Sequence, residues 1–409
     1  MLKRNLESIA EFDEVFDWLM AQAQTHTETE SVALSKALGR VLAEPVYSPM
    51  EMPPWRQAAM DGYAYATRCN EEWLGINRHV YAGDVMTEVG EHGLNEAVAI
   101  MTGAPVPDHL DAILPVEKSF VQRRMLSQGD MREFLLKPEQ TLVGQHIREV
   151  GSEIAKEQLL LPKGQKIGAR ELALLASVGV TEVKVSSLMK VVLLTTGDEL
   201  VAVGENLSAG QIYESNSWLI SALCQALPVE MLAVEHLADD EAATWEKIAY
   251  WGDRADVVLT IGGASKGEKD QIKSFLKRQP NSQVWQLNMK PAKPFSTTQL
   301  KRARLIALPG NPLAAFMSFQ LLVKPFLYKL SGLKGWQSPS QKMRLTTPFE
   351  NMSERVEWLQ VAISDQGLEI LNAREIGQLV CLTRADGYIR VNPKQSCQAG
   401  DWIEFWSYS

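Results

Sequence analysis

The spacing of apolar residues predicts that the chain begins with two helices. Residues 8–24 open with Ser8-x-x-Glu11, the pattern of a capping box, and their apolar positions recur at helical spacing: Ile9, Phe12, Phe16, Leu19 and Met20. A second apolar helix is predicted over residues 32–42. The proline-marked residues 49–55 that follow are expected to run extended, because proline and the residue before it avoid helical geometry.

The pattern then changes to short apolar runs separated by glycine, proline and charged turns. Such runs, for example residues 97–100 and 112–114, predict a β-rich segment from residue 60 to about residue 145. A helical period returns at residues 169–178, with Gly179 as the expected C-cap. If this later part packs beside the N-terminal helices, the β-rich segment is an insertion into an elongated first domain.

From residue 190 the rhythm is β-α-β. Strands are predicted at residues 191–195, 229–234, 256–261, 283–287 and 305–308, and helices at residues 218–227, 241–250, 271–277 and 313–330. Strands that are apolar on both faces belong in a parallel sheet covered by helices on each side. After Gly335, short strands bounded by turns predict a small C-terminal β domain.

These patterns predict an α/β multidomain fold with four domains. Residues 1–55 and 147–186 form a discontinuous, elongated α+β domain, and residues 56–146 form the inserted β-rich domain. Residues 187–334 form a doubly wound, mostly parallel α/β domain, and residues 335–409 a β-barrel-like C-terminal domain. A chain of 409 residues has room for this number of domains.

Charge and composition restrict the partners. The chain has 41 Lys and Arg against 50 Asp and Glu, a net charge of −9, which argues against sequence-independent nucleic-acid binding. Any anionic substrate must therefore meet a local cluster of cations. The N-terminus lacks the pattern of a secretory signal, and the 4 cysteines lack metal-site or disulfide spacing. We expect a cytoplasmic protein with no membrane partner.

Candidate chemistry follows four of the predicted strands, because ligands of open parallel sheets bind at the carboxyl ends of the strands. The loops cover residues 195–200, 262–270, 289–294 and 308–312. Glycines and Ser265 in the second loop predict an anion-binding concavity ahead of a helix, although an ordinary strand-to-helix turn gives the same pattern. The positive charge would come from Lys266, Lys269, Lys290 and Lys293.

Carboxylates on the same rim suggest a magnesium site. Asp198, Glu199 and Asp270 lie on these loops, and Asp239 and Asp240 follow the second strand. Mg²⁺ binds a few protein carboxylates together with substrate phosphates, whereas helix capping is an equal alternative for Asp239. None of the 6 histidines stands in metal-ligand spacing, and a hydrolase is disfavoured because the sequence offers no plausible catalytic triad.

Seven ordered motifs give the chain a resemblance to the molybdopterin molybdenumtransferase family, which includes MoeA and the C-terminal half of gephyrin. The motifs are M-D-G-Y-A at residues 60–64, T-G-A-P at 102–105, T-G-D-E-L at 196–200, G-Q-I-x-x-S-N at 210–216, G-G-x-S-x-G-x-x-D at 262–270, K-P-x-K-P at 290–294 and L-P-G-N-P at 308–312. The resemblance covers most of the chain and weakens after Gly335.

The resemblance implies a molybdopterin-binding type of doubly wound domain and the last step of molybdenum cofactor synthesis. In that step, adenylylated molybdopterin releases AMP and molybdate is inserted, with Mg²⁺ as cofactor. The resemblance further implies a homodimer whose cleft is shared, so that Asp61 and Thr102 arrive from the other subunit. An upstream molybdopterin adenylyltransferase would supply the substrate, and molybdoenzymes would accept the product.

The same resemblance implies roles for individual residues. Glu199, Asp239 and Asp270 would serve Mg²⁺ or substrate, and Lys290 would contact anionic oxygens, so that the catalytic set is Glu199, Asp270, Lys290, Asp61 and Thr102. The implied substrate-binding residues are Thr196, Gly197, Asp198, Gly262, Gly263, Ser265, Gly267, Lys293, Pro309, Gly310, Asn311 and Pro312. Ser265 and the surrounding glycines would cradle the pterin phosphate, and Pro309 and Pro312 would shape the pocket floor.

Two departures from the family pattern leave alternatives open. Gln286 stands where a basic residue is common, and Ala292 replaces a glycine of the K-P-G-K-P loop. With alanine at 292, we expect that this loop either does not need a positive φ or shifts slightly. A carrier or scaffold that holds molybdopterin with weakened catalysis, and an adenylyltransferase of the preceding step, are the competing hypotheses.

Overall fold

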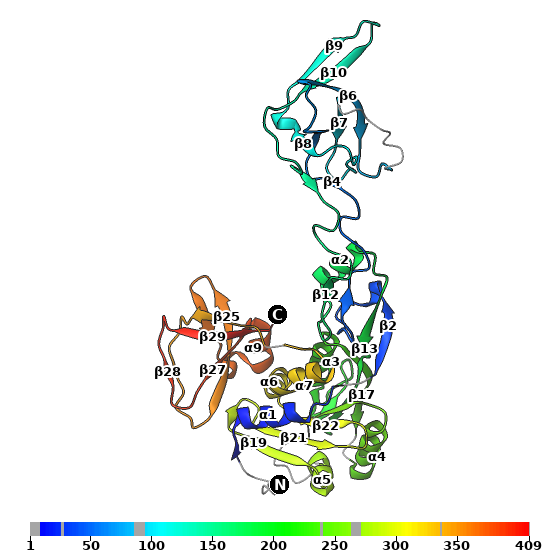
Figure 1. Ribbon diagram of the computed structural model, residues 1–409. Coiled ribbons are helices and arrows are strands. Elements are labelled where there is room, and N and C mark those ends of the chain that lie inside the picture. Colours follow the sequence, from blue (N-terminus) through cyan, green and yellow to red (C-terminus); the bar gives the residue numbers. More distant parts are fainter. Residues whose placement is uncertain are drawn as a thin grey trace.

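The computed structural model describes residues 9–25, 28–85, 95–237, 240–262, 271–335 and 338–408. Figure 1 shows an elongated molecule with a six-stranded sheet at one end, short strand pairs in the middle and a seven-stranded sheet at the other end. A further six-stranded sheet, formed mainly by the C-terminal part of the chain, lies beside the seven-stranded one. The expected mixed α/β architecture of several units is confirmed.

The seven-stranded sheet has the strand order β1-β19-β21-β22-β18-β14-β17. Its strands are β1 (Ile9–Ala10), β14 (Met189–Thr196), β17 (Val229–Leu237), β18 (Val257–Ile261), β19 (Gln283–Leu287), β21 (Pro294–Gln299) and β22 (Arg304–Leu308). All neighbours pair in parallel except β21, which is antiparallel to both β19 and β22. The sheet is therefore mostly parallel, as predicted.

Helices cover both faces of this sheet. On one face lie α1 (Phe12–Gln22), α3 (Asn216–Gln225), α6 (Pro312–Ser318) and α7 (Lys324–Leu330), and on the other α4 (Glu241–Gly252) and α5 (Gln271–Arg278). In β14, Val191 and Leu193 join the first core while Val192 and Leu194 join the second. This division explains why the strand is apolar at successive positions.

One helical stretch among the described residues passes a simple test for a membrane span. Pro312–Leu330 is 19 residues long. Its most apolar 18 residues have a mean hydropathy of 1.2, and 83% of them are buried inside the protein. It comprises α6, the π-helical turn Phe319–Val323 and α7. Its burial against the sheet identifies it as a core helix.

The predicted beginning of the chain is partly wrong. Helix α1 starts at Phe12, and Glu11 is its N-cap without a side-chain hydrogen bond, so the expected capping box does not start the helix. Ser8 itself lies outside the described residues. The residues before the helix belong to β1, where Ile9 pairs with Gln286 of β19. Pairing with the sheet therefore delays the start of the helix.

The second predicted helix, over residues 32–42, is also wrong. The chain instead forms β2 (Thr29–Ala33) and a single 3-10 turn, Leu34–Lys36. Strand β2 pairs antiparallel with β13 (Glu182–Ser186), where Val32 lies opposite Val183. A valine-containing segment that finds a distant strand partner prefers the sheet, because β-branched side chains pack well on a pleated surface.

Short strand pairs connect the two halves of the middle region. Besides β2 and β13, β3 (Val46–Tyr47) pairs with β12 (Leu159–Leu161) and β4 (Gln57–Ala58) with β11 (Ile147–Arg148). Between β3 and β4 the chain bends, with one bridge from Met52 to Ile154. Helix α2 (Ala169–Ser177) is followed by Gly179 at φ +77°, as predicted for its C-terminus. Both flanks of the β-rich segment thus pair with each other, whereas β1 and α1 pack on the seven-stranded sheet.

The β-rich segment folds into a sheet of order β8-β5-β7-β6-β10-β9. Its strands are β5 (Gly62–Tyr65), β6 (Trp73–Val80), β7 (Glu96–Ile100), β8 (Ala112–Pro115), β9 (Val121–Met125) and β10 (Met131–Leu136). A Cβ on Gly62 would lie 2.1 Å from the carbonyl oxygen of Leu114, so the glycine permits β5 to approach β8.

The C-terminal sheet does not form the expected barrel. Its order is β20-β25-β27-β29-β23, with β26 also on β25, and no closed barrel forms among the described strands. The strands are β20 (Met289–Lys290), β23 (Ser340–Arg344), β25 (Val356–Ser364), β26 (Gly367–Ile370), β27 (Gly387–Val391) and β29 (Trp402–Ser407). β20 comes from the chain between β19 and β21, so a segment of the seven-stranded unit occupies one edge.

Candidate functional site

Three loops meet at the carboxyl edge of the seven-stranded sheet. Thr196 ends β14, Gly262 follows β18 and Gly310 follows β22. Gly262 has a φ of +87°, and a Cβ there would lie 2.7 Å from the carbonyl oxygen of Thr196. A Cβ on Gly310 would lie 3.8 Å from Cα of Gly262. The three loops therefore touch through their backbones, and Gly262 meets two requirements that only glycine satisfies.

The loop after β14 carries two exposed carboxylates, Asp198 and Glu199. Glu199 turns its carboxylate over Gly197, where a Cβ would lie 2.8 Å from Oε1. Among the described residues, none pairs with this carboxylate. The backbone is held by a pair of short strands, β15 (Leu200–Val201) and β16 (Ile212–Tyr213), in which Ile212 N donates to Glu199 O at 2.8 Å. The structure thus fixes the backbone and leaves the carboxylate accessible.

Several predicted site residues lie outside the described part of the chain: Asp239, Gly263, Ser265, Lys266, Gly267, Lys269 and Asp270. No group of three or more His, Cys, Asp or Glu side chains gathers as a metal site within the described ranges. Glu199 is the described member of the expected magnesium set. Exposed carboxylate oxygens are the ligands that a hard divalent ion prefers. Glu199, which pairs with no cation among the described residues, could therefore serve as the expected Mg²⁺ ligand.

The loop after β19 carries Lys290 and Lys293. Lys290 Nζ lies 3.2 Å from Oε1 and 3.3 Å from Oε2 of Glu357, a residue of β25. The loop closes back on β19 through a hydrogen bond from Leu287 N to Lys293 O of 2.6 Å. Ala292 is 3% exposed and has a φ of +73°. Of the two expected alternatives, the one in which this loop needs no positive φ is therefore wrong, because the alanine adopts the left-handed conformation typical of glycine.

The loop after β22 combines helix capping with packing. Pro309 is buried, and Asn311 is the N-cap of α6, with its Oδ1 accepting from Ala314 N at 3.1 Å. Pro312 occupies the first helical turn, where its missing N–H costs nothing. Asn216, at the start of α3, donates to Gly310 O at 2.7 Å. The loop is therefore fixed at both ends, which positions Gly310 at the rim.

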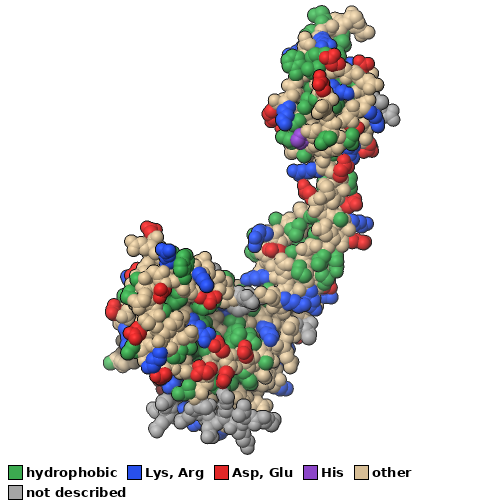
Figure 2. Space-filling model, turned by 60° about the vertical axis from the view of Figure 1, so that its left-hand side comes forward, with side chains coloured by type: hydrophobic (Ala, Val, Ile, Leu, Met, Phe, Trp, Pro, Cys, Tyr) green, Lys and Arg blue, Asp and Glu red, His purple; other side chains and the backbone are tan. Residues whose placement is uncertain are grey.

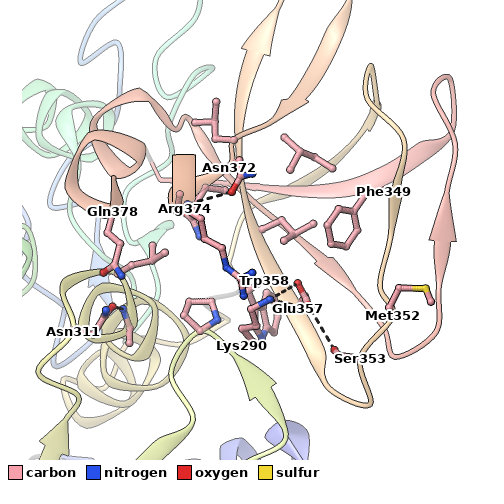
Figure 3. Close-up of a pocket in the computed structure, with 18 of the residues that line it drawn as sticks. Lys290, Asn311, Phe349, Met352, Ser353, Glu357, Trp358, Asn372, Arg374 and Gln378 are labelled. Atoms are coloured by element: carbon pink, nitrogen blue, oxygen red, sulfur yellow. Dashed lines mark hydrogen bonds and ion pairs between the residues drawn. The ribbon is translucent and has the colours of Figure 1, made fainter. Parts of the chain in front are cut away.

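A pocket of about 810 Å³ opens between this rim and the C-terminal sheet (Figure 3). Lys290 and Asn311 line it from the rim, and Trp358 and Arg374 from the C-terminal unit. Figure 3 shows Arg374 extending from α8 (Ala373–Ile376) toward Lys290. No carboxylate pairs with Arg374 among the residues that the structure describes. The pocket therefore offers one unpaired guanidinium beside one paired ammonium.

Apolar side chains form another part of the lining. Phe349, Met352, Leu359, Ile370 and Leu371 come from the C-terminal unit. An arginine suits bidentate contact with an oxyanion, while the aromatic and aliphatic side chains suit a flat or apolar group. This arrangement can bind a ligand that has an anionic part and a ring.

The contributors from the C-terminal unit were not predicted from the sequence. Glu357, Trp358, Arg374 and Gln378 line the pocket, yet they lie in the stretch where the motifs fade. No glycine turn or charged motif marks them. The parallel pairing of β20 with β25 brings them to the rim, and this long-range contact leaves no local pattern in the sequence.

Asp61 and Thr102 lie together, as two of the motifs suggested, but far from this pocket. Thr102 donates to Asp61 Oδ1 from both its backbone N and its hydroxyl, each at 2.7 Å. These hydrogen bonds, first that of the side chain and then that of the backbone, lower the pKa of Asp61. Asp61 directly precedes β5 and Thr102 closely follows β7, in the sheet that Figure 1 shows at the opposite end of the molecule from β22.

Comparisons with known proteins agree with this geometry. Residues 10–179 match the model "MoeA N-terminal region (domain I and II)", and residues 192–329 match "Probable molybdopterin binding domain". A molybdopterin molybdenumtransferase of Haemophilus influenzae is 34% identical over 337 residues, which cover 82% of this chain and 81% of that protein. Molybdopterin molybdenumtransferase 2 of Mycobacterium tuberculosis is 28% identical over 359 residues, 84% of this chain and 85% of its own length.

The whole fold also has a match among solved structures. The crystal structure of the molybdopterin biosynthesis moeA protein from Pyrococcus horikoshii OT3 superimposes with a TM-score of 0.81 at 25% identity. The match covers 98% of this chain and 100% of that one. The likeness therefore extends over the C-terminal unit, where the sequence motifs fade.

The positive φ of Ala292 generates a stability prediction. Ala292→Val should lower the free energy of unfolding by about 2 kcal/mol or more, because a β-branched residue is strained in the left-handed region and the site is tightly packed. Ala292→Gly should stay within about 1 kcal/mol of the wild type, since glycine relieves strain but loses a buried methyl group. Urea unfolding of both variants measures this; equal stability of the two would contradict the assigned backbone conformation.

The Thr102 contacts generate a titration prediction. In Thr102→Ala, the pKa of Asp61 should rise toward its ordinary value, because the variant loses the hydroxyl that stabilises the ionised carboxylate. In Thr102→Ser it should remain lowered, since serine keeps the donor. NMR titration of the Asp61 carboxyl carbon measures both. An Asp61 pKa that is the same in the alanine and serine variants would show that the hydroxyl does not act on it.

Proposed function

Because the chain belongs to the molybdopterin molybdenumtransferase family, we propose that it inserts molybdate into adenylylated molybdopterin and releases AMP. Membership makes the chain an enzyme of molybdenum cofactor biosynthesis. We further propose that it works in the cytoplasm, between an upstream molybdopterin adenylyltransferase and the molybdoenzymes that receive the cofactor. In the proposed step, the oxygen of a water adds to phosphorus, the phosphoric anhydride breaks, and AMP and a proton leave. The two sulfurs of the dithiol bind molybdenum, and one molybdate oxygen leaves as water with the two thiol protons.

One observation carries this proposal: motif loops that are far apart in sequence converge on one rim beside a pocket. Thr196, Gly262 and Gly310 touch there, and Lys290 and Asn311 line the adjoining pocket of about 810 Å³. The mixed lining suits the proposed substrate, because adenylylated molybdopterin joins anionic phosphates to ring systems. Arg374 and Lys290 would bind oxyanions, and the apolar side chains around Phe349 would contact a ring.

The rim residues would act mainly by positioning and by electrostatics. Lys290 would donate to an oxygen that gains charge as the anhydride breaks, and fixed donors are most effective where charge develops. Gly197 and Gly262 let the Glu199 carboxylate and the Thr196 carbonyl oxygen lie close to the backbone, so they would shape the rim beside which the phosphates bind. Pro309 and Pro312 would shape the floor, and Lys293 would add positive charge at the edge of the loop.

Glu199, with Asp239 and Asp270, would hold Mg²⁺ at the same rim. The ion would neutralise phosphate charge and stabilise the leaving group. Of these three residues, Glu199 is described, and its exposed carboxylate, which pairs with no cation in the part of the chain that the structure describes, supports this assignment. Asp198 beside it would orient the phosphates or their waters.

We propose a homodimer in which the cleft is shared between subunits. Residues 56–146, here called the arm, stand away from the seven-stranded sheet in Figures 1 and 2. Asp61 and Thr102 lie on this arm and do not line the pocket of their own chain. Large apolar side chains are exposed beside the rim, at Val203 (64%), Ile212 (57%) and Trp218 (68%). A partner's arm placed against this surface would cover it and bring Asp61 and Thr102 to the cleft.

The proposed reaction predicts AMP release from purified adenylylated molybdopterin when molybdate and Mg²⁺ are added. Lys290→Ala should lower kcat by about a hundredfold or more, as expected when a donor to developing charge is removed. Lys301→Ala is the matched control, because that side chain is 82% exposed, pairs with Asp253 and does not line the pocket. Chromatographic measurement of AMP gives both rates.

The same assay separates the alternatives. No AMP above a blank, with molybdopterin still bound tightly, would contradict the transferase and support a carrier or scaffold. Consumption of ATP with free molybdopterin would instead identify adenylyl transfer.

A mixture of two inactive chains tests the shared cleft. Asp61→Ala and Asp270→Ala should each be inactive alone, whereas their hybrid dimers keep one intact cleft. Random exchange of subunits should therefore restore about a quarter of the wild-type activity. Co-expressed chains are compared with separately purified chains that have not exchanged, and the dimer is verified by light scattering. Activity in the hybrid no greater than the sum of the single variants would show that each cleft is built from one chain.

A further inference from the structure

The chain segment before Lys290 is built into the C-terminal sheet. β20 pairs in parallel with β25, so that Met289 lies opposite Val356 and Lys290 opposite Glu357. Val356 N donates to Asn288 O at 3.1 Å. The backbone that carries Lys290 is therefore held by a strand of a different unit, in addition to its connection to β19.

The side chain of Lys290 is held by the same strand. Glu357 has a side chain only 9% exposed, and its two oxygens lie 3.2 Å and 3.3 Å from Lys290 Nζ. Ser353 donates a further hydrogen bond to Oε1 at 3.3 Å. A carboxylate this buried needs an opposite charge, because an unpaired buried charge is strongly unfavourable. Figure 3 shows this pair within the pocket.

The strand that carries Glu357 is itself fixed against the N-terminal helix. The ring of the next residue, Trp358, packs edge-on against the rings of Phe12 in α1 and of Tyr388. The distances between ring centroids are 5.3 Å and 5.6 Å. Arg390, on the neighbouring strand β27, makes two hydrogen bonds to the carboxylate of Asp13, at 3.0 Å and 2.8 Å. These contacts join the C-terminal sheet to the layer that covers the seven-stranded sheet, so Glu357 holds a defined position relative to the rim.

We propose that Glu357 is a positioning residue for Lys290, and that the C-terminal unit serves the reaction by fixing this lysine through β20, β25 and the Glu357 carboxylate. The inference rests on the proposed function, in which Lys290 touches the substrate. An ammonium group has three donors. The Glu357 carboxylate accepts hydrogen bonds on one side of the Lys290 ammonium group. The other side of the group is left to donate to a substrate oxygen. A free lysine stem would sample many rotamers, whereas the ion pair selects one before the substrate arrives.

Glu357→Gln tests this, because glutamine keeps the size of the side chain and removes the charge. We expect kcat for AMP release to fall by about tenfold to a hundredfold, with a smaller change in KM. Glu357→Asp, which keeps the charge but shortens the side chain, should recover part of the loss. The matched control is Glu354→Gln, whose side chain is 82% exposed and paired with Lys394; its kcat should equal that of the wild type.

A double variant shows whether Glu357 acts through the lysine. In a Lys290→Ala background, Glu357→Gln should cause no further loss of kcat, because the group that it positions is gone. Additive losses, or an unchanged kcat in Glu357→Gln alone, would overturn the inference. Circular dichroism and thermal unfolding of each variant verify that the fold is retained.

A chemical readout decides the inference without turnover. In Glu357→Gln, the amine of Lys290 should react severalfold faster with acetic anhydride than in the wild type, because the carboxylate no longer occupies it. Lys293 should react equally in both, as measured by mass spectrometry of the peptide that contains them. Equal reactivity of Lys290 would overturn the positioning role. An inactive wild type that still shows the change at Lys290 would instead contradict the proposed function alone.

Discussion

The chain between β19 and β21 belongs to two sheets, and the arrangement of the pocket depends on this constraint. After Leu287 the chain leaves the seven-stranded sheet, gives Met289 and Lys290 to the C-terminal sheet, and returns as β21 from Pro294. The excursion is short, so the two sheets must lie close together at this point. The pocket forms beside this junction, because a rim and a sheet joined by so few residues cannot move far apart.

Much of the seven-stranded unit was predictable, since its parallel strands carry their signal locally. β14 contains the apolar run Val191–Leu194 and β18 is buried at every position, because both faces of these strands are covered. β21 was missed because three of its buried residues, Ser296, Thr297 and Thr298, are polar. Thr297 Oγ1 donates to Leu305 O at 2.6 Å. Partnering of this kind makes a polar strand tolerable in a core, but it depends on a neighbour that the local pattern does not reveal.

The candidate site likewise has a part that could be predicted from the sequence and a part that depends on distant contacts. The meeting of the loops at Thr196, Gly262 and Gly310 follows from topology, because the carboxyl ends of parallel strands share an edge. The glycines are explained in the structure by close backbone approach. The pocket wall at Glu357 and Arg374 follows from a strand pairing between units, which no periodicity predicts. Asp61 and Thr102 were associated only through the family resemblance, and their two mutual hydrogen bonds are a local fact of the six-stranded sheet.

The sequence predicts a local cluster of cations that would meet an anionic substrate despite an overall charge of −9. Of the four lysines expected there, Lys290 lines the pocket and Lys293 lies on the same loop, while Lys266 and Lys269 lie outside the described residues. Lys290 is paired with Glu357 at 3.2 Å, so the pair adds no net charge, and Arg374 is the cation of the lining that has no carboxylate partner among the described residues. If this pocket binds the substrate as we propose, its described lining would add little long-range attraction for an anion, and recognition there would depend on donors held in fixed directions. Preorganised donors act over hydrogen-bond distances and lose little to solvent screening. A site built in this way discriminates by the geometry of the anion rather than by its charge.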